Sequence, residues 1–186
     1  MAQTSTTLIS AKSHITSITG TDISLSATSG VYTISATSTV LTGAGKLAVG
    51  DLITVSGSAS NNSTFTVNTV VSTTELTVAE VVTSENADGS STITLDHVGF
   101  VSDKAKGDGY YSQPDGVHTV AYQVANDFNA DATIKMQGTL ATTPTEDDWF
   151  DIANTTFTSD TSTLTSSFNF TGNYVWVRSK TQLLTA

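Results

Sequence analysis

The sequence predicts an all-β protein, and three observations support this prediction. Threonine and serine number 36 and 24, together 60 of the 186 residues, and threonine with valine and isoleucine favours half-buried strands. Short stretches alternate apolar and polar residues with the two-residue period of a strand. No stretch has the sustained period of an amphipathic helix. We therefore expect a small β module followed by an antiparallel β-sandwich, with a strand-like N-terminal arm.

Residues 1–36 carry the weakest pattern. Their apolar residues are diluted by serine and threonine, as in Ile23-Ser24-Leu25. These residues are therefore expected to form either an extended arm that pairs with a neighbouring subunit or edge strands of the local fold. If the arm makes the contact, deleting residues 1–30 should weaken assembly and leave the C-terminal sandwich folded.

Residues 37–97 are expected to form the small β module. Alternation places residues such as Ile53 and Val55 on one face of a strand, and glycine- or asparagine-containing segments separate the strands. Asp88-Gly89 is a favoured hairpin turn. The strands are expected over residues 51–57, 64–71, 75–79 and 92–95.

Residues 98–186 are expected to form the β-sandwich and hold most of the aromatic residues. In the last strand Tyr174, Trp176 and Arg178 share one face, while valines occupy the other, which indicates a central strand covered on both sides or a strand at an interface. The strands are expected over residues 117–124, 133–140, 149–152, 164–170 and 174–178. The aromatic side chains expected in the core are Trp149, Phe150, Phe168, Phe170 and Trp176.

Charge and cysteine content argue against several classes of protein. Lys and Arg number 7 against 17 Asp and Glu, which gives a net charge of −10, so no basic patch is available for nucleic acid. The absence of cysteine excludes disulfides, a thiol nucleophile and a thiolate zinc site. No apolar run is long enough for a membrane span, and the N-terminus lacks a secretory-signal pattern.

The sequence contains no recognisable catalytic motif. His14, His97 and His118 lie in different segments without the spacing of metal ligands. Neither a phosphate-binding glycine loop nor a nucleophile elbow is present. We therefore expect a non-enzymatic protein without a cofactor or metal. A hydrolase is the weaker alternative, and it requires two acids that converge in a cleft.

One acidic cluster is the candidate ligand or interface surface. Glu146, Asp147, Asp148 and Asp151 surround Trp149, and the surface is assigned to Asp147, Asp148, Trp149 and Asp151. The alternative is a solvated turn in which Thr145 caps a short helical turn. A tryptophan at the junction of a loop and a strand can also bind a sugar by stacking. Both a packing role and a binding role therefore stay open for Trp149.

A second acidic cluster lies in a glycine-containing loop and consists of Asp103, Asp108 and Asp115. Either cluster could offer two or three oxygen ligands to Ca²⁺, but neither has the EF-hand spacing. A calcium site is therefore an open alternative and not the leading interpretation.

Two sets of motifs resemble known proteins. The segments GDLITVSG (50–57), NNSTFTV (61–67) and ELTV (75–78) resemble a small β module recurrent in tailed-phage structural proteins. The succession KGDGYY, DGVHTV, IKMQGTL, PTEDDWF and GNYVWVR, over residues 106–178, resembles virion structural proteins of tailed phages, especially contractile-tailed phages of marine cyanobacteria.

This resemblance implies a virion structural protein, first of all an exterior accessory such as a head decoration protein, assembled in the host cytoplasm. The alternative is a receptor- or glycan-binding module of a tail fibre or baseplate. The implied partners are other virion proteins and copies of the chain itself, with a host glycan in the alternative. The resemblance does not choose among head, neck, tail and fibre, and it carries no catalytic residue.

Overall fold

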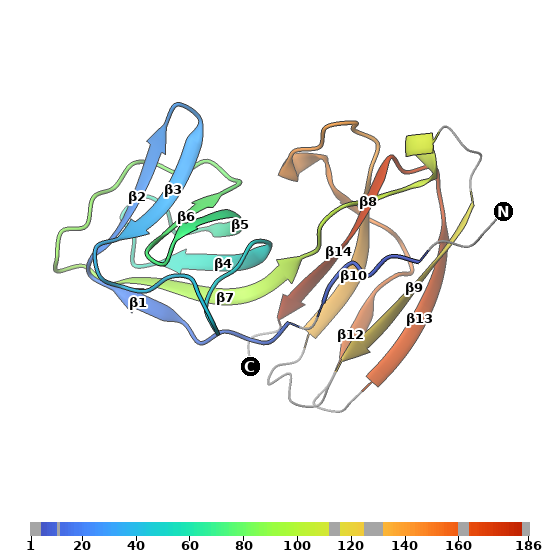
Figure 1. The fold of residues 1–186 in the computed structure, drawn as a ribbon, viewed down its shortest axis with the longest axis horizontal. Helices are drawn as coiled ribbons and strands as arrows, with labels where there is room; N and C mark the ends of the chain where they lie inside the picture. The colour runs from blue at the N-terminus through green and yellow to red at the C-terminus, as the bar shows by residue number, and fades with distance from the viewer. Residues whose placement is uncertain (1–4, 11, 112–115, 125–131, 160–163, 184–186) are drawn as a thin grey trace. The chain divides into compact units, whose positions relative to one another are not determined.

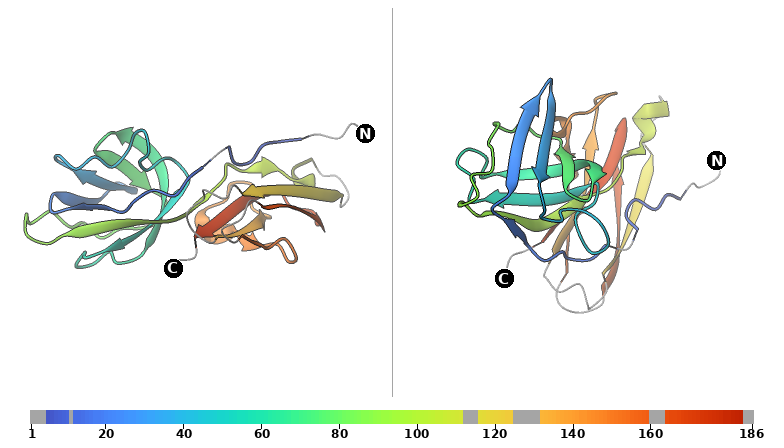
Figure 2. Two further views of the ribbon diagram at one scale, coloured as in Figure 1. Left: turned by 90° about the horizontal axis from the view of Figure 1, so that it is seen from below. Right: turned by 60° about the vertical axis from the view of Figure 1, so that its left-hand side comes forward.

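The computed structural model describes residues 5–10, 12–111, 116–124, 132–159 and 164–183. The chain forms two compact units (Figures 1 and 2), which are described separately. The central unit is His14–Phe100, and the C-terminal unit combines Met1–Ser13 with Val101–Ala186. The all-β prediction is confirmed, because the described regular structure consists of strands and two single-turn 3-10 helices. Within the described residues, no helix has the length and hydrophobicity needed to cross a bilayer.

The central unit is an antiparallel assembly in which one long strand, β5, takes part in two sheets. Its residues 64–66 pair with β4, and its residues 67–72 pair with β6. The pairing continues from β4 to β7 and β1, and from β6 to β3 and β2. The strands are β1 (Ile18–Gly20), β2 (Ile23–Thr28), β3 (Val31–Ala36), β4 (Asp51–Ser56), β5 (Thr64–Ser72), β6 (Glu75–Val78) and β7 (Ile93–Val101).

The hairpin between β2 and β3 depends on a two-residue turn. Ser29 and Gly30 both have positive φ angles, 52° and 78°, which is the requirement of a type I′ turn. The turn sets the register that pairs Leu25 with Ile34, and both side chains are buried.

The core of the central unit is almost entirely aliphatic. It includes Ile15 and Ile18 as well as residues of β2 and β3. Of the two alternatives for residues 1–36, a separate arm is wrong for residues 14–36, which instead form strands of the local fold and part of its core. The buried core residues are Ile15, Ile18, Ile23, Leu25, Ile34, Leu41, Leu47, Ile53, Val55, Phe65, Val67, Leu76, Val78, Val82, Ile93 and Leu95.

Carboxylates fix the loops of the central unit. Asp22 accepts hydrogen bonds from the backbone N–H groups of Ser38 and Thr39 and from their hydroxyls. The hydroxyl of Thr39 is the largest cause that lowers the pKa of Asp22 far below its ordinary value. The Glu85 carboxylate holds the loop after β4 in place, because it accepts hydrogen bonds from Ser58 Oγ (2.6 Å) and Ala59 N (2.9 Å).

The predicted Asp88-Gly89 turn exists, but it does not join two paired strands. Gly89 has a φ of 72°, and Asp88 accepts hydrogen bonds from Ser90 N and from Ser91 N and Oγ. The turn lies in the long connection between β6 and β7. It is therefore a side-chain-stabilised loop turn and not a hairpin turn.

The C-terminal unit contains two antiparallel sheets (Figure 1). In the larger sheet β10 lies between β14 on one side and β11 and β12 on the other, and β8 pairs with β14. The second sheet consists of β9 and β13. The elements are β8 (Ala105–Lys106), η1 (Asp108–Tyr111), β9 (Val117–Val124), β10 (Ala132–Thr139), η2 (Glu146–Asp148), β11 (Phe150–Asp151), β12 (Phe157–Ser159), β13 (Leu164–Thr171) and β14 (Trp176–Leu183).

The core between these two sheets differs from the predicted aromatic core. Phe170 is buried in it and Phe168 packs against it, but Trp149 and Trp176 are only half-buried, and Phe150 is 44% exposed. Leu8 of the N-terminal segment also packs against this core. The buried members are Tyr122, Val124, Ile134, Met136, Ile152, Phe170 and Val177.

The two faces of β14 have different neighbours. Val177 points into the core, and Trp176 and Arg178 belong to the opposite face, as the alternation predicted. Tyr174 departs from the prediction, because the strand begins only at Trp176 and the Tyr174 side chain packs against the core. The face of Trp176 and Arg178 is covered by the 141–149 loop: Trp176 Nε1 donates to Thr142 O, and the Arg178 guanidinium binds Glu146. The two tryptophans therefore fasten a loop to the sheet and do not fill the space between the sheets.

Candidate functional site

The predicted acidic surface lies over three adjacent strands of the larger sheet in the C-terminal unit. Gln137 of β10 is in register with Arg178 of β14 on one side and with Asp151 of β11 on the other. The three side chains form a row across the sheet. At the Arg178 end, Glu146 of the 3-10 helix η2 binds the guanidinium, and the same helix contains Asp147 and Asp148.

Arg178 connects this row to the 3-10 helix η2 and to Trp149. Its Nη1 and Nη2 donate to the two carboxylate oxygens of Glu146 at 2.9 and 2.7 Å, and its Nε donates to Gln137 Oε1 at 2.9 Å. The guanidinium carbon lies 4.2 Å from the centre of the Trp149 ring. Because Arg178 is only 5% exposed, these partners compensate for the loss of water around a buried charge.

Asp151 closes the other end of the row. It accepts from Gln137 Nε2 at 2.9 Å and forms an ion pair with Lys135. Partial burial by itself would raise the pKa of Asp151, but the hydrogen bonds from Lys135 and Gln137, with the charges of Lys135 and Lys180, outweigh it and lower the pKa. The carboxylate therefore stays ionised and bound at neutral pH.

The remaining predicted residues differ in their roles. Asp148 accepts from Thr145 N (2.7 Å) and Thr145 Oγ1 (2.8 Å), so it forms a capping box for η2, and these bonds lower its pKa. Asp147 is exposed. Trp149 has Arg178 on one face of its ring. The structure therefore connects Trp149 and Asp151 through Arg178 and Gln137, and it assigns Asp148 to the fold of the loop.

A second group of side chains on the same unit combines aromatic rings with lysines, and we call it the aromatic–lysine cluster. It consists of Lys104, Lys106, Tyr110, Tyr111 and Trp176. Lys104 Nζ lies 4.7 Å from the Trp176 ring centre, and Lys106 Nζ lies 4.1 Å from that of Tyr110. Tyr110 and Tyr111 remain 43% and 56% exposed, so the cluster presents aromatic surface to solvent.

Three glycine motifs of the C-terminal unit converge on Tyr174. A Cβ atom at Gly138 would lie 2.6 Å from the Tyr174 ring, and one at Gly172 would lie 2.4 Å from it. At Gly107 the added atom would lie 2.3 Å from the Tyr174 carbonyl oxygen. Each motif therefore requires glycine because the tyrosine or its backbone occupies the space of a side chain.

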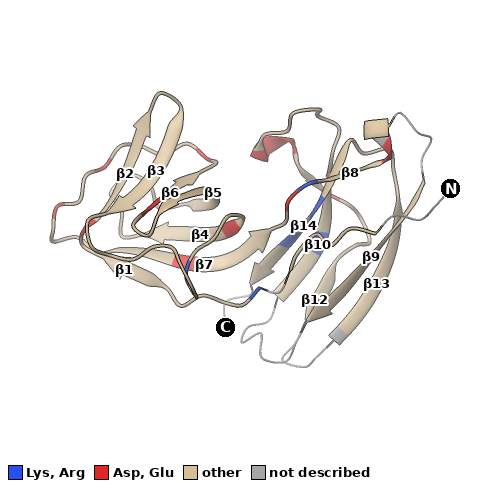
Figure 3. Cartoon of the chain, in the orientation of Figure 1, with Lys and Arg blue, Asp and Glu red and all other residues tan. Residues whose placement is uncertain are grey.

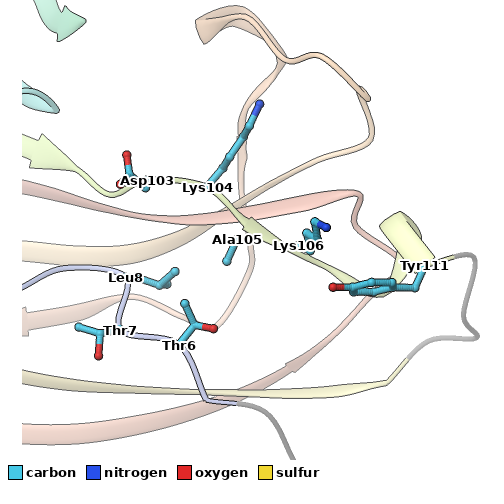
Figure 4. A pocket seen from close by; sticks show the side chains of 8 residues that line it. All are labelled: Thr6, Thr7, Leu8, Asp103, Lys104, Ala105, Lys106 and Tyr111. Atoms are coloured by element: carbon cyan, nitrogen blue, oxygen red, sulfur yellow. The ribbon is translucent and has the colours of Figure 1, made fainter. Parts of the chain in front are cut away.

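An open cavity of about 440 Å³ lies beside the aromatic–lysine cluster (Figure 4). The N-terminal segment contributes Thr6, Thr7 and Leu8, and β8 with its flanking residues forms the opposite wall. Figure 4 shows Tyr111 at one end of this space and Lys104 directed away from it. The lining residues are Thr6, Thr7, Leu8, Asp103, Lys104, Ala105, Lys106 and Tyr111.

The predicted loop cluster of Asp103, Asp108 and Asp115 is only partly described, because Asp115 lies outside the described residues. Asp108 accepts from Gly116 N at 2.7 Å and lies 3.3 Å from His118 Nε2. Within the described residues, no group of three potential ligands gathers around a point where a metal ion could bind. The described contacts of Asp108 are therefore structural ones that close the loop between β8 and β9.

The remaining motif residues of the central unit also have structural roles. Asp51 is buried and accepts from Ala48 N at 2.8 Å, and its Oδ1 lies 3.8 Å from His97 Nε2. Asn61 is 4% exposed and bonds both to Thr83 N and to Thr83 O. The glycine-aspartate and asparagine motifs therefore fold the loops that flank β4.

The sequence prediction did not identify Gln137, Lys135 or the lysines of the aromatic–lysine cluster as parts of the site. The signal for Arg178 was present, since a charged residue on the face of a central strand needs buried partners. The signal for its partners was absent, because pairing across β11, β10 and β14 depends on register over long sequence separation.

Comparison with known proteins adds no relative: no family model, curated protein or solved structure matches the chain.

Proposed function

We propose that the protein is a structural component of a tailed-phage particle, in the first place an exterior accessory such as a head decoration protein. The observation that carries this proposal is the internal pairing of the charged groups around Arg178. Glu146, Gln137 and Asp151 are held by neighbouring side chains, so the surface that they support is fixed in shape. A fixed surface favours binding because little side-chain entropy is lost on contact.

The exposed composition beside this network supports a role in protein contacts. Tyr110, Tyr111 and Phe150 are each more than 40% exposed, and aromatic residues are enriched where proteins bind one another. The resemblance of the motifs to tailed-phage virion proteins supplies the kind of partner: other virion proteins and further copies of the chain. Assembly in the host cytoplasm belongs to the same proposal.

The test is detection of the chain in purified particles by mass spectrometry, followed by antibody labelling of intact particles. Regular labelling over the head is the expected result. A Tyr110→Ala/Tyr111→Ala variant should fold normally and be incorporated less, whereas a Val81→Ala variant in the central unit is the matched exposed control. Particles without the chain would contradict the virion proposal, and labelling confined to the tail tip would contradict decoration.

A glycan-binding module of a tail fibre or baseplate is the second candidate, and the open cavity is the observation that favours it. Threonines, Lys106 and Tyr111 line this space, and polar groups beside an exposed aromatic ring are the surroundings in which a sugar can form hydrogen bonds and stack. The test is a glycan array with the wild type and Tyr111→Ala. Sugar binding that is lost in the variant, without a change in melting temperature, would favour this candidate.

A further inference from the structure

The two-stranded sheet of β9 and β13 has long outer edges that lack a strand partner among the described residues. Within the described residues these two strands pair only with each other. Each is eight residues long, which corresponds to about 26 Å. Their pairing runs through eight consecutive residue pairs without a shift of register. The outer edge of each strand therefore has backbone N–H and C=O groups that can accept a further strand.

Where the structure describes the chain, the strands at the other sheet margins are short or are covered by another segment. In the C-terminal unit β8, β11 and β12 are only two or three residues long. In the central unit the edge of β2 is covered, because Leu25 exchanges two backbone hydrogen bonds with Glu85. Short and covered edges are the usual protection against unwanted strand pairing. The β9–β13 sheet has neither form of protection among the described residues.

Charge and proline, which also protect strand edges, are missing from these two strands. Their sequences, VHTVAYQV and LTSSFNFT, contain no Lys, Arg, Asp, Glu or Pro. The exposed face of β13 carries Thr165, Ser167, Asn169 and Thr171, whose side chains can hydrogen-bond to their own kind across a strand pair. Because β9 contains His118, which lies against Asp108, β13 is the strand without any ionisable side chain.

We infer that β13 pairs antiparallel with β13 of a second copy of this chain, which joins two β9–β13 sheets into one four-stranded sheet. The net charge of −10 makes two copies repel each other over most of their surfaces, and a strand without ionisable groups allows them to approach. A two-fold axis that passes between the two β13 strands, level with their middle, places the same backbone groups of both copies opposite each other. This inference rests on the proposed association of copies and not on the location of the assembly in a particle.

The test uses the position nearest the proposed two-fold axis. Ser167 lies near the middle of β13, so pairing about this point places it opposite Ser167 of the second copy. Ser167→Lys and Ser167→Glu each place like charges together and should raise the dissociation constant by up to about fivefold. An equal mixture of the two variants should restore association, because opposite charges then meet. Light scattering after size-exclusion chromatography gives the mass, and circular dichroism checks the fold.

Ala121→Lys is the matched control. Ala121 is the cross-strand partner of Ser167 and is exposed on the same face, but it belongs to β9. This variant should associate like the wild type. Loss of association in Ala121→Lys alone would overturn the β13 assignment in favour of the β9 edge. A wild-type chain that is monomeric at every concentration would overturn the inference, whereas the virion proposal is decided separately by the composition of purified particles.

Discussion

The two units achieve a β-fold with different side chains. The central unit has 3 of the 14 Phe, Trp and Tyr residues and a single basic residue, Lys46, whereas the C-terminal unit has 11 aromatic residues and the other 6 basic ones. Figure 3 shows most Lys and Arg near β8, β10 and β14. Carboxylates that accept hydrogen bonds hold loops in both units, and the C-terminal unit adds contacts between cations and aromatic rings.

This difference shows how a chain that is rich in threonine and serine can build two stable cores. Aliphatic side chains fill the central unit with one or two residues per strand, and hydroxyls satisfy the carboxylates at its turns. In the C-terminal unit large rings cover the sheet faces, and each ring needs a specific neighbour. The central unit should therefore depend on buried volume, and the C-terminal unit on individual polar contacts.

The largest effect is expected for Ile34→Ala in the central unit. Ile34 has no exposed surface and pairs with Leu25 and Leu76, so its truncation should cost about 3 to 4 kcal/mol of unfolding free energy. Hydrogen exchange measured by mass spectrometry should show increased exchange in residues 14–100. Exchange that increases equally in the C-terminal unit would contradict the separation of the two cores.

Arg178→Lys should produce the largest effect of a polar substitution in the C-terminal unit. Lysine keeps the charge but cannot make the bidentate bond to Glu146 together with the bond to Gln137. We expect a loss of about 2 kcal/mol in a denaturant titration. Lys180→Gln, two residues further along β14, is the control and should change stability by at most about 0.5 kcal/mol. Equal effects of the two variants would contradict the central role of Arg178.

Trp149→Ala should have a smaller effect, because Trp149 is half-buried and stacks on Arg178. We expect a loss of about 1 to 2 kcal/mol and a modest decrease in melting temperature. Trp176→Ala should be similar, since its ring fastens the same loop through Thr142. An unchanged melting temperature together with lost sugar binding in Trp149→Ala would favour the glycan-binding candidate.

The smallest effect is the pH dependence of the central unit. Hydrogen bonds from hydroxyl and backbone groups lower the pKa values of Asp22, Glu85 and Asp88 in the folded state, so the unfolded chain binds more protons in acid. Their stabilisation is fully present above the ordinary carboxylate pKa of about 4 and disappears as the pH falls through the lowered values. Asp22→Asn should therefore melt earlier at neutral pH.

In strong acid the difference in melting temperature between Asp22→Asn and the wild type should become smaller, because the wild-type carboxyl group is then protonated and uncharged, like the asparagine amide. Thermal unfolding at a series of pH values measures this convergence. Melting curves that stay separated by the same amount at every pH would show that Asp22 acts through its shape and not through its charge.

The fold class and the clearest strands could be predicted because alternation is a local property. Ile53 and Val55 follow it in β4, and the structure buries both. Leu25 and Ile34 follow it more weakly because serine and threonine dilute the apolar residues, so the sequence did not decide between an arm and strands of the local fold. The alternation in β14 was recognised correctly, but Trp176 was assigned to the core because hydrophobicity alone does not decide which face of a strand is buried.

The candidate site could be predicted only in part. The acidic residues around Trp149 stood out because they are adjacent in sequence. Their partners Gln137 and Arg178 are separated from each other by 41 positions along the chain, and only the pairing of β10 with β14 brings them together. Sequence adjacency therefore located the loop, whereas the residues that hold it depend on sheet register.

Along the sequence, the central unit lies between the two segments of the C-terminal unit, and this order has a consequence for synthesis on the ribosome. The core residues of the central unit lie between residues 15 and 95, so this unit can fold as soon as β7 has emerged. Leu8 is made earlier, but it packs against a core that includes Phe170 and Val177. At ordinary elongation rates these residues follow it by on the order of ten seconds. The first segment to be translated is thus among the last to reach its final place.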